Sequence, residues 1–136
     1  MGGDYPPAGL HTQKNTTPDP RRGSLSLFLV YIREAHPEGG WAIPAADGIC
    51  YRQPKTLASR LAVAAKFAEH QAEWCAGVPM LVDDPTTNAL DIAYEAPPER
   101  LVVLDEQLNV VFASGQGPFQ YSVPKLAAFV KAQLGE

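Results

Sequence analysis

The run SLSLFLVYI, residues 24–32, is the most strongly strand-forming stretch of the chain. It begins with an alternation of polar and apolar side chains and then becomes continuously apolar, rich in β-branched and aromatic residues. A continuous apolar run of this length is typical of a strand whose two faces are both covered. The sequence therefore predicts that order starts at about residue 24, with a buried strand.

Strand and helix patterns alternate downstream of this run. The loop expected over 34–55 is long, and a loop of that length in a compact domain is usually functional or mobile. The other expected elements are a helix over 56–74, a strand over 78–82, a helix over 84–95, a hairpin of strands 100–104 and 109–113, and a last helix that Ser122 caps. This order predicts an α/β layered sheet with an antiparallel hairpin at one edge.

The sequence also predicts where the helices begin and which face they bury. Thr56 is a suitable N-cap for the first helix. Asp84 is a suitable N-cap for the second, with Pro85 at the first helical position, where its missing N–H costs nothing. In the first helix the expected core-facing residues are Leu57, Leu61, Ala64, Ala65 and Ala68, with Arg60, Lys66 and Glu69 off that stripe.

Composition points to one globular domain behind a polar tail. The 136 residues fit a single domain, and 46% of them are hydrophobic. Residues 1–23 hold four prolines and no periodic apolar pattern, so we expect a disordered tail before a domain over 24–136. A net charge of −4 without a long Lys/Arg run gives no footprint for nucleic acid or an anionic membrane. With no signal-peptide or membrane-span pattern, we expect a cytoplasmic protein.

The cysteines and histidines form no recognisable pattern. Cys50 and Cys75 are too few for a disulfide scaffold and too far apart for a CxxC redox pair. The three histidines are scattered without metal-ligand spacing, so we expect no metal. Each thiol is either a redox group or an idle one.

Residues 30–41, VYIREAHPEGGW, are similar to the motif V-Y-I-E-E-A-H-x-x-D-G-W of the iodothyronine deiodinase family. Four further stretches resemble family motifs in the same order. They are PKTL at 54–57 with Arg60 (H-R-S-L-x-x-R), LVD at 81–83 (V-V-D), PERLVV at 98–103 (P-E-R-L-Y-V-I) and GQGPFQY at 115–121 (G-x-G-P-x-x-Y). The resemblance covers about residues 25–134, and we expect a bacterial deiodinase-like protein.

The resemblance implies a thioredoxin-like fold and reductive removal of iodine from thyroid hormones. Family enzymes use a selenocysteine, or a cysteine in many bacterial relatives, with an external thiol reductant and no further cofactor. The nucleophile attacks iodine, and a nearby acid protonates the ring carbon. On this resemblance His36 and Glu34 are the candidate catalytic pair that handles the proton. Arg100, Trp41 and Pro98 are the candidate substrate-binding residues, with Arg100 gripping an anionic group and Pro98 following a cis peptide bond.

Plainer interpretations of these residues stay open. His36 and Glu34 can be ordinary solvated loop residues, and Arg100 can pair with a neighbouring carboxylate, either Glu99 or Asp105. Trp41 can anchor its loop by burial.

The chain departs from the family pattern at three places. The family's nucleophile lies upstream of the V-Y-I strand on a strand-loop-helix unit, and residues 1–23 contain no cysteine and no strand pattern. Pro54 stands where the family has a substrate-contacting histidine, and Arg33 where it has the first glutamate of E-E-A-H. We therefore expect a partial thioredoxin-like domain that lacks its first strand-helix unit.

The missing strand is central in a thioredoxin core, between the strands expected at 25–32 and 100–104. Without it, two half-sheets expose unpaired backbone groups, and each such group costs about 1–3 kcal/mol when buried. Net stability is only about 5–15 kcal/mol, so a few such groups decide whether the chain folds. Either the halves close up, or a partner supplies the strand, or the chain is a gene fragment. The sequence favours the fragment.

The expected function is that of a deiodinase-like oxidoreductase, inactive alone for want of its nucleophile. Its partners would be a small aromatic or halogenated substrate, or simply a disulfide, and a thiol reductant. One alternative is a non-catalytic thioredoxin-like binding module. Another is a peroxiredoxin-like thiol protein that uses Cys50 or Cys75. A homo-oligomer also stays open, because unpaired sheet edges favour association.

Overall fold

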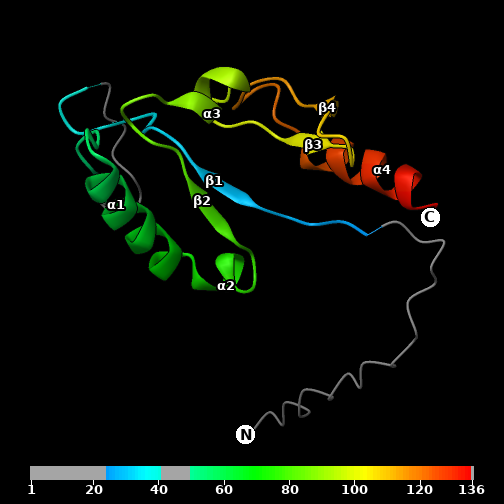
Figure 1. The fold of residues 1–136 in the computed structure, drawn as a ribbon, viewed down its shortest axis with the longest axis horizontal. Helices are drawn as coiled ribbons and strands as arrows, with labels where there is room; N and C mark the ends of the chain where they lie inside the picture. The colour runs from blue at the N-terminus through cyan, green and yellow to red at the C-terminus, as the bar shows by residue number, and fades with distance from the viewer. Residues whose placement is uncertain (1–23, 41–49, 136) are drawn as a thin grey trace, which may run out of the picture.

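The computed structural model describes residues 24–40 and 50–135, so the tail expected over 1–23 lies outside the described residues. The elements are β1 (Leu29–Tyr31), α1 (Leu57–His70), α2 (Ala72–Cys75), β2 (Met80–Val82), α3 (Ala89–Ala93), β3 (Val102–Leu104), β4 (Val110–Ala113) and α4 (Val123–Leu134). The expected order of strands and helices is confirmed (Figure 1), except that the first helix is divided at Gln71.

The strands form two separate sheets of two strands each. β1 and β2 run parallel, with Val30 opposite Leu81. β3 and β4 form the expected antiparallel hairpin, with Val103 opposite Phe112. Among the described residues no strand joins the two sheets, which lie apart in Figure 1. The fold is therefore mixed α/β, built as two small sheets.

The first strand is shorter and more exposed than its sequence indicates. Strand pairing covers only residues 29–31, where β2 runs alongside. Leu25, Leu27 and Phe28 are more than half exposed, at 57%, 60% and 53%. The expectation of a run covered on both faces is wrong for this part of the chain, because the described residues bring one partner strand and no second one.

Helix α1 begins as predicted, and its predicted buried face is confirmed only at Ala64. Thr56 is the N-cap: its hydroxyl accepts from the Ser59 N–H, and the Ser59 side chain accepts from the Thr56 N–H. The buried side chains are Arg60 and Ala64, whereas Leu57 and Leu61 of the expected stripe are 41% and 48% exposed. Arg60 tolerates burial because its Nη1 donates to the Asp83 carbonyl and to Asn88 Oδ1, both at 2.9 Å.

The start of α3 corrects the expectation for Asp84 and Pro85. The helix begins at Ala89, four residues after Pro85, the expected first helical residue. Asp84 instead closes a turn, where its carboxylate accepts from the Thr86 N–H and hydroxyl. The buried Asp83 carboxylate caps α3, accepting from the N–H groups of Leu90 and Asp91 at 3.1 and 3.0 Å.

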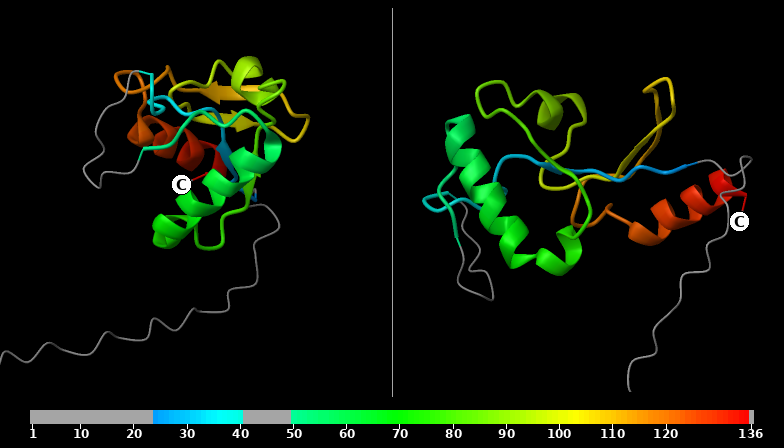
Figure 2. Two further views of the ribbon diagram at one scale, coloured as in Figure 1. Left: turned by 90° about the vertical axis from the view of Figure 1, so that its left-hand side faces the viewer. Right: turned by 60° about the horizontal axis from the view of Figure 1, so that its bottom comes forward.

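The C-terminal part packs as a hairpin on a helix. Ser122 caps α4 as predicted, accepting from the Lys125 N–H. Phe129 of α4 stacks on Phe112 of β4, with ring centroids 5.1 Å apart. Two further views show α4 alongside the hairpin and α1 on the other side of the molecule (Figure 2).

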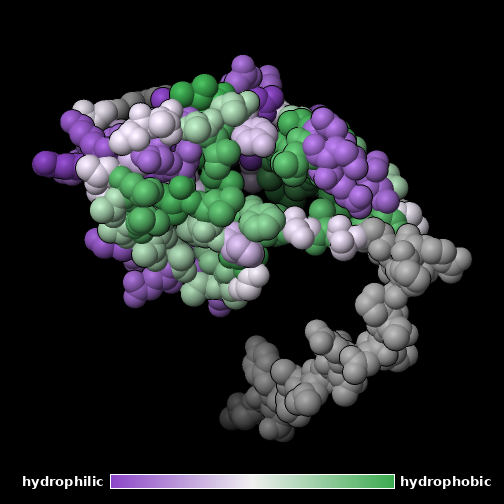
Figure 3. Space-filling view, viewed as in Figure 1, coloured by the Kyte–Doolittle hydropathy of each residue, from purple (hydrophilic) through white to green (hydrophobic). Residues whose placement is uncertain are grey.

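The hydrophobic core is small for a chain of this composition. Among the described hydrophobic residues only Ala64 is fully buried, at 2% exposure. Large apolar side chains on both sheets stay accessible to solvent. In the space-filling view they gather around a hollow between the two parts of the molecule (Figure 3). The elements therefore form without enclosing a common core.

Candidate functional site

The candidate site lies where the chain leaves β1. Strand β1 ends at Tyr31, and Arg33, Glu34 and His36 follow within five residues. In α/β sheets the loops after the carboxyl ends of parallel strands are the usual place for ligands. The predicted proton-handling pair, Glu34 and His36, therefore lies in one loop at that end of the sheet.

Glu34 is held by the strand that precedes it. The Tyr31 hydroxyl donates a short hydrogen bond to Glu34 Oε1. Burial raises the pKa of Tyr31 well above its usual value, and the hydrogen bond and negative charge of Glu34 raise it further. Tyr31 thus stays protonated and acts as a fixed donor to the Glu34 carboxylate.

Gln53 fixes the backbone of Glu34 from the other side. Its Oε1 accepts from the Glu34 N–H at 2.9 Å, and its Nε2 donates to the Glu34 carbonyl at 3.0 Å. The carboxamide therefore joins the end of β1 to the segment that enters α1. Sequence reasoning missed Gln53, because the contact spans 19 residues and no local motif marks it.

His36 is half-buried and lies beside a cysteine. The Cys50 thiol donates to the backbone carbonyl of His36 at 3.6 Å, and Cys50 itself is exposed. This contact, made to the main chain of His36, places the sulfur of Cys50 near the loop. Cys75 lies at the end of α2, away from this loop.

Arg100 is held mostly by main-chain oxygens. Its Nε donates to the Ser114 carbonyl at 2.8 Å, and its Nη1 donates to the Tyr94 carbonyl at 2.9 Å. Its acidic partner is Glu95, with Nη1 3.3 Å from Oε2, rather than either neighbour considered from sequence. The Arg100 side chain is 21% exposed.

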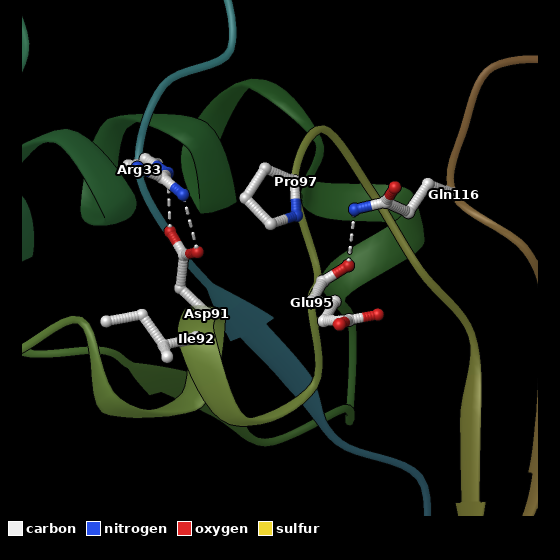
Figure 4. Close-up of a pocket in the computed structure, with 6 residues that line it drawn as sticks. All are labelled: Arg33, Asp91, Ile92, Glu95, Pro97 and Gln116. Atoms are coloured by element: carbon white, nitrogen blue, oxygen red, sulfur yellow. Dashed lines mark hydrogen bonds and ion pairs between the residues drawn. The ribbon is translucent and has the colours of Figure 1, made fainter.

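Pro98 follows a cis peptide bond, as predicted. Pro97, the residue on the other side of that bond, lines a cavity of about 450 Å³. The cavity lies between the loop after β1 and the segment around α3 (Figure 4). Its lining residues are Arg33, Asp91, Ile92, Glu95, Pro97 and Gln116.

An ion pair forms one wall of this cavity. The Arg33 Nη2 donates to Asp91 Oδ1 at 3.0 Å, and its Nε lies 2.8 Å from Oδ2. The Asp91 carboxylate is fully buried, whereas Arg33 is 48% exposed. Arg33, which departs from the family motif, therefore neutralises a buried acid and turns its outer surface to the cavity (Figure 4).

Trp41, the remaining predicted binding residue, lies outside the described residues. Across 24–40 and 50–135, no three His, Cys, Asp or Glu side chains gather where a metal ion could bind. In the same part of the chain, no helix has the length and apolar character needed to cross a membrane.

The comparisons with known proteins all indicate the same family. The model of the iodothyronine deiodinase family matches residues 22–133. The type II iodothyronine deiodinase of Fundulus heteroclitus is 32% identical over 113 residues, which cover 80% of this chain and 41% of that protein. The human type II enzyme is 30% identical, covering 81% of this chain and 40% of its own length. The thyroxine 5-deiodinase of Gallus gallus is 38% identical, covering 76% and 38%.

These relatives correct one expectation. They are vertebrate proteins, so the bacterial relationship expected from sequence is wrong for the curated relatives that match. This chain spans about two-fifths of their length. Because the family model covers most of the chain, from residue 22 to residue 133 in α4, the chain belongs to the iodothyronine deiodinase family.

Proposed function

We propose that the chain is part of a thioredoxin-like reductase that removes halogen from a small aromatic substrate. A selenolate or thiolate outside the described residues attacks the iodine, the carbon–iodine bond breaks, and the ring carbon takes a proton from the Glu34 and His36 loop. A thiol reductant then releases iodide from the nucleophile and is itself oxidised to a disulfide. Free thiols in a protein of this kind favour a reducing, cytoplasmic location.

The observation that carries this proposal is the arrangement after β1 in a chain of this family. Glu34 is fixed by Tyr31 and Gln53, and His36 lies in the same loop. A general acid needs a defined position within hydrogen-bond reach of the atom that it protonates. The double tether of Glu34 supports such a role for the loop.

Substrate recognition is proposed for Arg100 and the cavity beside Pro97. The Arg100 side chain is partly exposed, and a guanidinium suits a phenolate or carboxylate because its fork presents several donors. The backbone contacts of Arg100 hold it in one orientation, which limits the entropy lost on binding.

Iodide release tests the proposal. The strand-loop-helix unit that precedes the V-Y-I strand in the Gallus gallus relative is joined to Ser24, and the product is incubated with an iodinated phenol and dithiothreitol. We expect iodide release from the joined protein, and a loss of about 10²-fold or more in His36→Ala. Lys131→Ala, on the exposed surface of α4 and outside the candidate site, serves as control in the joined protein. Equal rates for the His36 variant and its parent would contradict the role of the loop.

A second candidate function uses Cys50 as the nucleophile, and its contact with the His36 carbonyl favours it. Cys50 would then attack the substrate itself, with no added segment. Iodide release by the unmodified chain that disappears in Cys50→Ser, but not in Cys75→Ser, would support this candidate. No release from the unmodified chain would leave the first proposal standing.

A further inference from the structure

The cavity beside Pro97 is formed by three segments that are far apart in the sequence: the loop after β1, the region around α3 and the turn after β4 (Figure 4). Its volume of about 450 Å³ lies within the range of about 300–1,000 Å³ that is common for small-molecule sites. Its lining side chains comprise one cation, two carboxylates, one amide and two apolar groups. A cavity of this size and composition suits a small organic ligand with few polar groups.

Arg33 is fixed at the cavity wall by one edge of its guanidinium. Nη2 donates to Asp91 Oδ1 at 3.0 Å, and Nε lies 2.8 Å from Asp91 Oδ2. These two nitrogens share one edge of the planar group, so Nη1 lies on the opposite edge. Within 24–40 and 50–135, the side-chain contacts of Arg33 involve only Nε and Nη2. The described part of the chain therefore leaves the two N–H donors of Nη1 unused.

Asp91 holds Arg33 in a defined orientation. The Asp91 carboxylate is fully buried, and the Asp91 N–H donates to the Asp83 carboxylate at 3.0 Å in the cap of α3. A guanidinium that a fixed carboxylate already orients loses little further freedom when it binds a second anion. The ion pair thus prepares Arg33 for a ligand as well as neutralising the buried acid.

The remaining walls restrict the rest of the ligand. Ile92 and Pro97 supply apolar surface, and Ile92 is 66% exposed. Gln116 is held by its Nε2, which donates to the Glu95 carbonyl at 2.8 Å. The Glu95 carboxylate has Arg100 as its cationic partner, with Nη1 3.3 Å from Oε2. A second negative charge in the ligand would be repelled by Glu95, so the walls favour one anionic group on an apolar body.

We propose that this cavity is a binding site for a small monocarboxylate with an aromatic body. The carboxylate accepts from Nη1 of Arg33, and the ring packs against Ile92 and Pro97. The motif that residues 30–41 resemble has a glutamate at the position of Arg33, so this chain departs from that motif in the charge it brings to the cavity. The inference rests on the proposed function for the halogen of the substrate and not for its carboxylate.

Two probes of matched size test the preference for charge: 3-iodobenzoate and its neutral analogue 3-iodobenzamide. Each is titrated into the full 136-residue chain without reductant, and the Arg33 Nε–H and Ile92 N–H signals are followed by nuclear magnetic resonance. We expect saturable millimolar binding of 3-iodobenzoate with shifts of both signals. Binding of 3-iodobenzamide should be about fivefold weaker, because a charge-assisted hydrogen bond is stronger than a neutral one.

Three results of this titration would overturn the proposal. They are no binding of 3-iodobenzoate at millimolar concentrations, equal affinities for the two probes, and shifts of the Arg100 Nε–H signal without shifts of the Arg33 signal. Arg100 does not line the cavity, so the third result would locate the carboxylate elsewhere.

A double variant separates ligand binding from neutralisation of Asp91. Arg33→Gln with Asp91→Asn replaces the ion pair by two amides, so no buried charge is left without its partner. We expect the parent's amide spectrum outside the cavity and affinities for the two probes that agree within about twofold. A double variant that keeps the preference for 3-iodobenzoate would overturn the proposal.

A second variant acts on the cavity without changing the ion pair. Glu95→Gln removes a carboxylate from the lining, so it should strengthen 3-iodobenzoate binding about two- to threefold and leave 3-iodobenzamide binding unchanged. Its matched control is Glu106→Gln, which makes the same change of net charge at an exposed position between β3 and β4. Equal 3-iodobenzoate affinities for these two variants would place the carboxylate outside the cavity and overturn the proposal.

Binding and dehalogenation are measured separately, so their outcomes are distinguishable. No iodide release from the joined protein, with 3-iodobenzoate bound at Arg33, would contradict the proposed function and uphold the binding site. Iodide release with equal affinities for the two probes would uphold the proposed function and overturn the binding site.

Discussion

Asp91 has a fully buried carboxylate whose cationic partner, Arg33, is half exposed. We expect Arg33→Ala to lower the free energy of unfolding by about 1–3 kcal/mol, because it leaves a buried acceptor without its donor. The matched control is Arg52→Ala, which removes the exposed ion pair with Glu38 and should cost about 0–1 kcal/mol. Urea unfolding of the two variants gives the comparison, and equal losses would contradict the account of the Asp91 environment.

Tyr31 should make the stability of the folded protein fall as the pH rises above about 10. Its folded-state pKa is raised by burial and by Glu34, so the unfolded chain loses this proton first, above about pH 10. The stabilising contribution is therefore complete below about pH 10 and is lost as the pH rises toward the folded-state pKa. We expect the urea midpoint of the parent to fall more steeply between about pH 9 and pH 11 than that of Tyr31→Phe. Parallel pH profiles would show that Tyr31 titrates alike in both states.

For single residues, the sequence predicts those roles in which the interacting partner lies only a few residues away. Thr56 and Ser122 are caps with partners three residues away, and the cis bond before Pro98 follows from the family motif. Gln53 and the buried orientation of Arg60 were not predictable, because their partners lie 19 and 23 residues away. Such contacts depend on how α1 is placed against β1 and β2.

Among the elements, α3 shows how two adjacent acids divide their roles. Asp83 is buried and caps the helix, whereas Asp84 closes the turn before it. We expect Asp83→Ala to cost about 1–3 kcal/mol, since two N–H groups lose their acceptor. Asp84→Ala should cost clearly less, because its turn is accessible to water. Urea unfolding ranks the two variants, and a larger loss for Asp84→Ala would contradict the observed cap.

Hydrophobic patterning predicts the order and type of the helices and strands, but not the residues at which they begin and end. The pattern Asp-Pro at 84–85 predicts a helix start, and the helix begins at Ala89 because Asp83 reaches forward to cap it. The apolar run at 24–32 predicts a covered strand, and pairing ends where β2 ends. In both cases tertiary contacts override a valid local signal.

For the whole molecule, the sequence predicts an α/β fold, and the described residues form mixed α/β structure with two sheets of two strands. In the candidate site Glu34 is held by Tyr31 and Gln53, and Arg100 by the carbonyls of Ser114 and Tyr94. The described residues include two cysteines, Cys50 and Cys75. The positions of Glu34 and Arg100 follow from hydrogen bonds within the described part of the chain.

Residue-resolved amide hydrogen exchange of the free chain tests the separation of the two sheets most directly. We expect Tyr31 and Val103, which face their partner strands, to exchange slowly, and Val30, Val102 and Leu104 to exchange at least tenfold faster. Equal protection of all five amides would mean that β1 and β3 already share a strand, and the account of an open sheet would be wrong.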